Sequence, residues 1–117
     1  MHSLQGLDVA KTAVDVAADM QAVDIVLLDV RDLTSFADYF VICSATSERH
    51  LKAIVDEIER KLKDADVKPL YVEGTVVSGW IVQDCGDVIV HVFSPEQRDY
   101  YRLERIWQKG VPVIRIQ

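Results

Sequence analysis

A continuous hydrophobic run at Tyr39–Cys43 is the strongest feature in the pattern of hydrophobic and polar positions. A run of this length without alternation is typical of a strand buried on both faces. It is followed by a polar turn, Ser44–Ser47, in which Thr46 or Ser47 is suited to cap a helix. From Leu51 to Ala65 hydrophobic residues recur at helical spacing, so one face of a long helix should pack on the sheet. Strand, turn and amphipathic helix together indicate an α/β domain.

The rest of the chain predicts one helix before this unit, and several strands and a helix after it. The expected elements are a helix with Leu7, Ala10, Val14, Ala17 and Ala18 on its buried face, a strand at Asp24–Val30, the central strand and helix, strands at Leu70–Glu73 (closed by Gly74), Val76–Asp84 and Val88–Phe93, and a last helix from Ser94 to near Gly110. We therefore expect an α/β fold in which residues 1–117 form a single domain, with a mixed sheet of about five strands that carries helices. Residues 108–117 are a C-terminal tail, whose apolar part either adds a strand or contacts another chain.

The charge of the chain changes the range of expected partners. The formal net charge is −6 and there is no basic tract. Binding to nucleic acid rests largely on Lys and Arg at phosphates, so direct sequence-specific nucleic acid binding is not expected. An acidic surface suits a basic protein partner, although the same charge also serves simply to keep a domain in solution.

Targeting signals and cysteine usage indicate a cytoplasmic protein. No apolar stretch approaches the roughly 20 residues that cross a bilayer, and the N-terminus lacks the pattern of a signal peptide. Cys43 and Cys85 lie within or beside apolar strands, where a reduced thiol behaves as a small hydrophobic side chain. We expect no membrane association.

A search for catalytic groups finds no recognisable site. The histidines and cysteines lack the spacing of a zinc site, so neither a metal nor another cofactor is expected, and His91 reads as a hydrogen-bonded core residue. Ser44 and Ser47 lie near His50, but no nucleophile elbow surrounds them and helix capping explains them. The alternative function is a small nucleotide-binding or nucleotidyl-transferring enzyme that uses Asp84, Asp87 and the serine-containing turn.

Trp80 is the residue that a hydrophobic core alone does not require. It shares one face of its strand with Asp84, and Glu73 and Asp87 are expected nearby. An aromatic side chain within an acidic rim has the composition of an interface anchor. A Trp packed under a helix is an equally common arrangement, and the residues alone leave both readings open.

At these positions the sequence closely resembles the bacterial ribosomal silencing factors, the Iojap family, from Leu7 to Trp107. The matching stretches are Asp24–Val30, Asp38–Cys43, Thr46–His50 with Ala53 and Ile54, Glu73–Gly74, Trp80, Asp84–Phe93, Arg98–Glu104 and Trp107. Family members usually have Gly where Ala45 stands and a larger residue where Cys85 stands. These departures affect turn geometry and packing.

The resemblance implies a nucleotidyltransferase-like fold that lacks the catalytic carboxylates. It also implies a non-enzymatic factor that binds the large ribosomal subunit through the ribosomal protein L-fourteen. The factor then blocks the joining of the small subunit and represses translation under nutrient limitation. A homodimer is implied for the free protein. For partner binding we expect Trp80, Asp84 and Asp87, with Tyr71 and Glu73 beside them. Arg98 and Tyr100 are further candidates for this contact.

Overall fold

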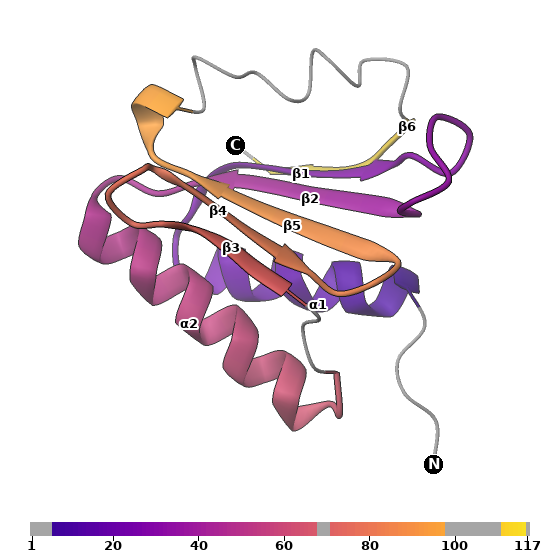
Figure 1. The fold of residues 1–117 in the computed structure, drawn as a ribbon, viewed down its shortest axis with the longest axis horizontal. Coiled ribbons are helices and arrows are strands. Elements are labelled where there is room, and N and C mark those ends of the chain that lie inside the picture. Colours follow the sequence, from indigo (N-terminus) through magenta and orange to yellow (C-terminus); the bar gives the residue numbers. More distant parts are fainter. Residues whose placement is uncertain (1–5, 68–70, 98–110, 117) are drawn as a thin grey trace.

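The computed structural model describes residues 6–67, 71–97 and 111–116. These residues form two α-helices and six β-strands (Figure 1), which are α1 (Gly6–Asp19), β1 (Val23–Asp29), β2 (Tyr39–Ser44), α2 (Glu48–Asp64), β3 (Tyr71–Thr75), β4 (Trp80–Asp84), β5 (Val88–Phe93) and β6 (Val111–Ile116). Beyond Gln97, the predicted last helix with Arg98, Tyr100 and Trp107 lies outside the described residues.

The strands form one mixed sheet in the order β3-β4-β5-β2-β1-β6. The central strands β2 and β5 are parallel, and all other neighbours are antiparallel. Both central strands are buried along their whole length, as their continuous hydrophobic runs predict. The expected α/β fold with a mixed sheet is confirmed.

The apolar tail is an added strand of this sheet. β6 pairs antiparallel with β1, with Ile116 opposite Ile25 and Val111 opposite Asp29. The sheet therefore has one strand more than expected within the described residues. The sequence left this open because the two paired segments lie at opposite ends of the chain, and local patterns carry no information on such a pairing.

Both helices pack on the same face of the sheet (Figure 1). The buried residues of α2 are Leu51, Ile54, Val55, Ile58 and Leu62, as the helical spacing predicts. Of the two predicted capping residues it is Ser47 that caps α2, since its hydroxyl accepts the backbone N–H of His50 at 3.0 Å. In α1 the expected face is shifted, because Ala18 is exposed whereas Ala13 and Val16 are buried.

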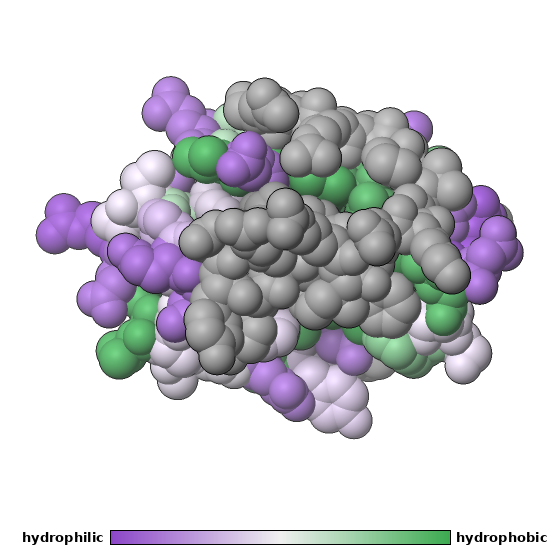
Figure 2. All heavy atoms as spheres, turned by 90° about the horizontal axis from the view of Figure 1, so that it is seen from above, coloured by the Kyte–Doolittle hydropathy of each residue, from purple (hydrophilic) through white to green (hydrophobic). Residues whose placement is uncertain are grey.

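A second hydrophobic cluster covers the sheet face opposite the helices. Its buried members are Val26, Leu28, Val30, Ala37, Phe40, Ile42, Ile89 and Phe93, and Leu33, Trp80 and Val82 pack at its margin half-buried. Figure 2 looks onto this face and shows hydrophobic patches, with hydrophilic side chains gathered toward its two ends. Trp80 therefore lies on the face opposite α1 and α2.

The hairpin that carries Trp80 differs from the sequence prediction. β4 begins at Trp80, whereas a strand was expected from Val76, and the intervening residues 76–79 form a turn. Gly74 lies inside β3 with φ of 91°, although we expected it to end that strand. Its positive φ explains the difference, because glycine permits a strand to continue through a backbone conformation that other residues avoid.

Candidate interaction surface

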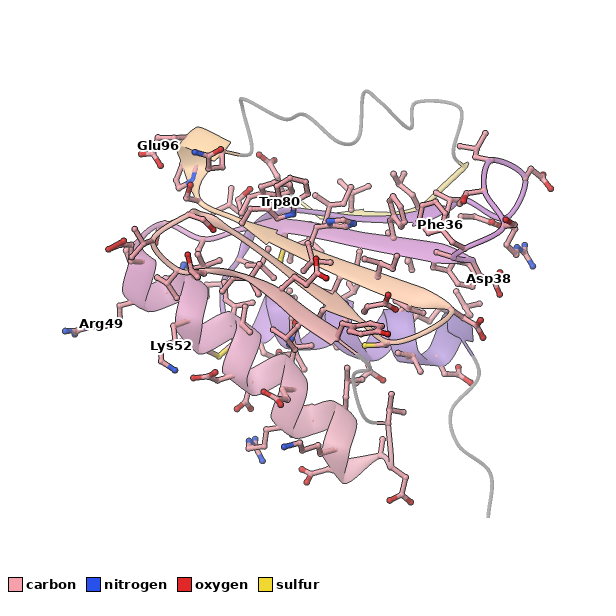
Figure 3. The ribbon with its side chains drawn as sticks, viewed as in Figure 1. Phe36, Asp38, Arg49, Lys52, Trp80 and Glu96 are labelled. Atoms are coloured by element: carbon pink, nitrogen blue, oxygen red, sulfur yellow. The ribbon has the colours of Figure 1, made fainter. Side chains whose placement is uncertain are left out.

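The β3–β4 pairing brings four of the five predicted partner-binding residues onto one sheet face. Tyr71 lies opposite Asp84, and Glu73 lies opposite Val82. Residues directly opposite in an antiparallel pair point to the same side, and Trp80 shares that side of β4 because side chains alternate along a strand. Tyr71, Glu73, Trp80 and Asp84 therefore share one side of the sheet. Figure 3 shows Trp80 on the side opposite the helices.

Trp80 packs at the margin of the hydrophobic cluster on the face opposite α1 and α2, and its role in partner binding remains a prediction. The side chain is half-buried and its ring stacks on Phe93, with centroids 5.1 Å apart and planes inclined by 26°. Its indole Nε1–H donates to Nδ1 of His91 at 3.3 Å. These two contacts hold the ring in place, so it would lose little freedom on binding a partner.

His91 is the buried hydrogen-bond partner of Trp80. The prediction of a hydrogen-bonded core histidine is confirmed. Its exposed fraction is 7%, and its ring lies edge-on to Phe40 with centroids 5.0 Å apart. Because Nδ1 accepts from the indole, the proton of the neutral ring sits on Nε2, which has no hydrogen-bond partner among the described residues. Burial lowers the pKa of His91 to about 4, so the imidazole is neutral at pH 7.

An open pocket of about 280 Å³ lies beside Trp80. It is lined by Glu73, Gly74, Ser78, Trp80 and Val82. The turn at residues 76–79, which joins β3 to β4, is held by two hydrogen bonds between Ser78 and Thr75. The Ser78 hydroxyl donates to the carbonyl of Thr75 at 2.7 Å, and the Ser78 backbone N–H donates to Thr75 Oγ1 at 3.0 Å. The pocket wall is therefore held in place before any ligand arrives.

The edge of the sheet next to this pocket is exposed. Every residue of β3 is exposed, with Tyr71 at 63% and Val72 at 50%, and Val77 in the following turn reaches 86%. Among the described strands β3 is at the edge of the sheet. Large apolar side chains that gather at a sheet edge are typical of an interaction surface.

Asp87 lies apart from this face. It lies in the β4–β5 turn, where its carbonyl accepts the backbone N–H groups of Asp38 at 2.7 Å and Tyr39 at 3.1 Å. Its Cβ lies 3.4 Å from where a side chain at Gly6 would begin, so it sits beside the start of α1. Asp84 stays on the face, and its Oδ1 accepts the N–H of Gly86 at 2.9 Å.

Residues 3–117 match the family model described as "Ribosomal silencing factor during starvation". The chain belongs to the ribosomal silencing factor family. The ribosomal silencing factor of Bacillus subtilis (strain 168) is 36% identical over 107 residues, which cover 92% of this chain and 88% of that relative. The crystal structure of a protein from Chromobacterium violaceum has a TM-score of 0.86 and 34% identity, and the match covers 90% and 88% of the two chains. The chloroplast protein Iojap of Zea mays is 34% identical over 113 residues, 92% of this chain and 46% of its own length.

Membership of the ribosomal silencing factor family confirms the resemblance seen in the sequence. Within the described residues, no helix has the length and apolar character required to cross a bilayer. The same part of the chain contains no group of three or more His, Cys, Asp or Glu side chains placed to hold a metal ion.

His50 and Cys85 were considered in the search for catalytic groups, and the structure gives the surroundings of each. In the turn before α2, Nδ1 of His50 accepts the N–H of Thr46 at 2.9 Å, and its Nε2 lies 2.7 Å from the carbonyl oxygen of Met20. The imidazole therefore ties the start of α2 to the end of α1. Burial raises the pKa of the Cys85 thiol to about 11, so it stays protonated at pH 7 and is a poor nucleophile.

Sequence reasoning missed the contacts of Trp80 with His91 and Phe93. The β4–β5 register places Phe93 opposite Trp80 and His91 opposite Val82, so all four residues share one face. The signal was present, because the tight Cys85–Gly86 turn joins two adjacent strands. Counting outward from that turn pairs the two strands residue by residue.

The depressed pKa of His91 predicts an acid-dependent loss of stability. The unfolded chain takes up a proton near pH 6.5, whereas the folded chain does so only near pH 4. The contribution of His91 to the free energy of unfolding is therefore fully present above about pH 6.5. It falls as the pH decreases toward 4, by about 3 kcal/mol in total at about 1.4 kcal/mol per pH unit. Urea unfolding across this range measures the slope.

The control for this experiment is His91→Phe, which keeps an aromatic ring but cannot titrate. The variant should lose most of the dependence between pH 6.5 and 4, whatever its absolute stability. An equal slope in the two proteins would assign the acid sensitivity to other groups.

Proposed function

We propose that this protein binds the large ribosomal subunit through the sheet face that carries Trp80 and blocks the joining of the small subunit. The proposed contact on the ribosome is the ribosomal protein L-fourteen, and the expected outcome is lower translation when nutrients are scarce. The observation that carries the proposal is membership of the ribosomal silencing factor family. The protein would act in the cytoplasm, where ribosomal subunits join.

The physical properties of the face support a basic protein partner. Trp80 is a rigid, half-buried aromatic anchor, and Glu73 and Asp84 place carboxylates around it. Together with a net charge of −6, these groups favour encounter with a positively charged surface. Blocking needs only that the bound domain occupies the place where the small subunit docks, so the proposed mechanism is steric and requires no catalysis.

Sedimentation of ribosomal subunits tests this function. Small and large subunits are mixed under conditions that favour joining, with and without a saturating amount of the protein. We expect the joined ribosomes to be replaced by free subunits, with the protein sedimenting alongside the large subunit. Full association at saturation would contradict the proposal. Tight, magnesium-dependent binding of nucleoside triphosphates in calorimetry would instead favour the enzyme alternative.

We further propose that the free protein forms a homodimer, as the family resemblance implies. In the described part of the sheet the outer strands are β3 and β6, and an outer strand offers backbone for pairing with a second chain. Light scattering at micromolar concentration measures the mass directly. A monomer mass throughout that range would contradict a dimer.

A further inference from the structure

The hydrogen bond between Trp80 and His91 joins two neighbouring strands diagonally. Trp80 stands opposite Phe93 in the β4–β5 pairing, and His91 is two residues before Phe93, opposite Val82. Side chains at this diagonal spacing share one sheet face and can touch when they are aromatic. The indole Nε1–H donates to Nδ1 of His91 at 3.3 Å, with the ring centroids 6.0 Å apart. The contact therefore ties the first residue of β4 to the interior of β5.

His91 offers its ring nitrogen from a fixed place. Its strand β5 is buried along its whole length and pairs with β2 on one side and β4 on the other. The imidazole lies edge-on to Phe40, with centroids 5.0 Å apart, and nearly parallel to Phe93, with planes inclined by 9°. A side chain packed in this way is held close to one rotamer. The acceptor for the indole is thus in position before any partner binds.

The stack of Trp80 on Phe93 does not by itself choose which edge of the indole faces His91. Stacking acts between ring faces, and a half-turn of the indole about its bond to Cβ keeps a face on Phe93 while it exchanges the two edges of the ring. The pyrrole edge carries the N–H donor and the opposite edge carries none. The hydrogen bond to Nδ1 is therefore compatible with one of these two orientations.

The same bond requires one tautomer of His91. An indole N–H donates and cannot accept, so Nδ1 carries no proton and the proton of the neutral ring lies on Nε2. A ring with its proton on Nδ1 would set a donor against a donor. The tautomer of His91 consequently decides whether the orientation of the indole is held.

We propose that His91 is a positioning residue, which as its Nε2–H tautomer selects the orientation in which the Trp80 indole contacts the protein partner. The contact with a partner rests on the proposed function, whereas the selection of an orientation does not. A side chain that already has its bound orientation loses less freedom on binding. Removing the acceptor should therefore weaken binding although it removes no group from the partner contact.

Nuclear magnetic resonance of the free protein tests the selection of the orientation. Long-range proton–nitrogen correlation at pH 7 reads the tautomer of His91, and nuclear Overhauser contacts show which edge of the indole faces it. We expect the proton on Nε2 and the pyrrole edge toward His91. In His91→Leu, which has no acceptor, the indole signals should broaden or split as both orientations are populated. A proton on Nδ1, or an indole that keeps its orientation in His91→Leu, would overturn the proposal.

The pair His91→Asn and His91→Leu tests the consequence for binding. The two new side chains have similar shapes, but Asn places a carbonyl oxygen near the position of Nδ1. Leu should give the more stable protein, because the site is buried and apolar. A role limited to packing thus predicts tighter binding for His91→Leu. We expect the reverse: His91→Leu should bind isolated large ribosomal subunits about 2- to 10-fold more weakly than the unmodified protein, the range of one neutral hydrogen bond, and His91→Asn should recover most of the loss.

Leu28→Ala is the control for damage to the same hydrophobic cluster, since Leu28 is buried on this face in β1. It should lower the midpoint of urea unfolding and leave the affinity of the folded protein unchanged. Equal affinities of folded His91→Leu and His91→Asn would overturn the positioning role while ribosome binding stands. If the unmodified protein does not bind the subunit, yet the indole loses its single orientation in His91→Leu, the selection by His91 stands and the proposed function fails.

Discussion

Trp80→Ala should lower the affinity for isolated large ribosomal subunits by about 30- to 1000-fold, which corresponds to about 2–4 kcal/mol. The physical reason is that the substitution removes the rigid aromatic centre of the proposed surface. A partner that fitted against the indole would then face a void beside Phe93. Co-sedimentation with large subunits over a range of protein concentrations measures the loss.

The same substitution should also reduce stability, which the sequence alone did not predict. Trp80 loses a ring stack with Phe93 and a hydrogen bond to His91, and the side chain is half-buried. We expect a loss of about 1–3 kcal/mol in the free energy of unfolding, less than for a fully buried Trp. A domain with a typical stability of about 5–15 kcal/mol remains folded.

Ile81→Ala is the matched control for this experiment. Ile81 is the next residue of β4, but its buried side chain belongs to the helix-side core. Its truncation should cost about 2–4 kcal/mol of stability and leave the affinity of the folded protein close to that of the unmodified chain. If Trp80→Ala and Ile81→Ala bind equally well once folded, Trp80 is a packing residue and not the anchor of an interface.

Gly74→Ala should destabilise the protein by about 2–4 kcal/mol, although the added group is one methyl on an exposed edge strand. Gly74 has φ of 91°, a conformation that costs an L-residue about 1–2 kcal/mol. In addition, a Cβ atom at this position would collide with the carbonyl oxygen of Trp80. A backbone atom cannot rotate away as a side chain can, so β3 must separate from β4.

Gly6→Ala serves as the control for a methyl group on glycine. At Gly6 the new Cβ would lie 3.4 Å from Cβ of Asp87 and 3.7 Å from the Tyr39 ring, which are ordinary contacts. Alanine also favours helix, so α1 should be unchanged or gain up to about 1 kcal/mol. Urea unfolding of the two variants measures the difference; equal free energies of unfolding would mean that the β3–β4 hairpin tolerates a side chain at Gly74.

The sequence predicted the elements whose signals are local. Continuous hydrophobic runs identified β2 and β5, and helical spacing identified α2 and its buried face. The pairing of β6 with β1 was left open because it joins distant segments. Gly74 was placed at a strand end because glycine more often marks a turn than an irregularity within a strand. Its position inside β3 is explained by its positive φ and by the close approach of the Trp80 carbonyl, which only the structure shows.

The candidate surface was predicted in composition but not in detail. Alternation along β4 and the family resemblance selected Trp80, Asp84, Tyr71 and Glu73, and the β3–β4 register places them on one face. Asp87 was grouped with them as part of an expected acidic rim around Trp80 and from the family resemblance. The turn places it instead beside the start of α1, where its Cβ lies next to Gly6. Their roles in binding remain predictions.

Hydrogen–deuterium exchange of the protein bound to large ribosomal subunits tests most directly that its function resides on the β3–β4 face. We predict that excess subunits slow exchange in peptides covering Tyr71–Asp84, including strand β3. The exposed face of α2 at Glu48–Asp64 should exchange as it does in the free protein. Protection confined to the helices, with unchanged exchange across Tyr71–Asp84, would contradict the proposed binding surface.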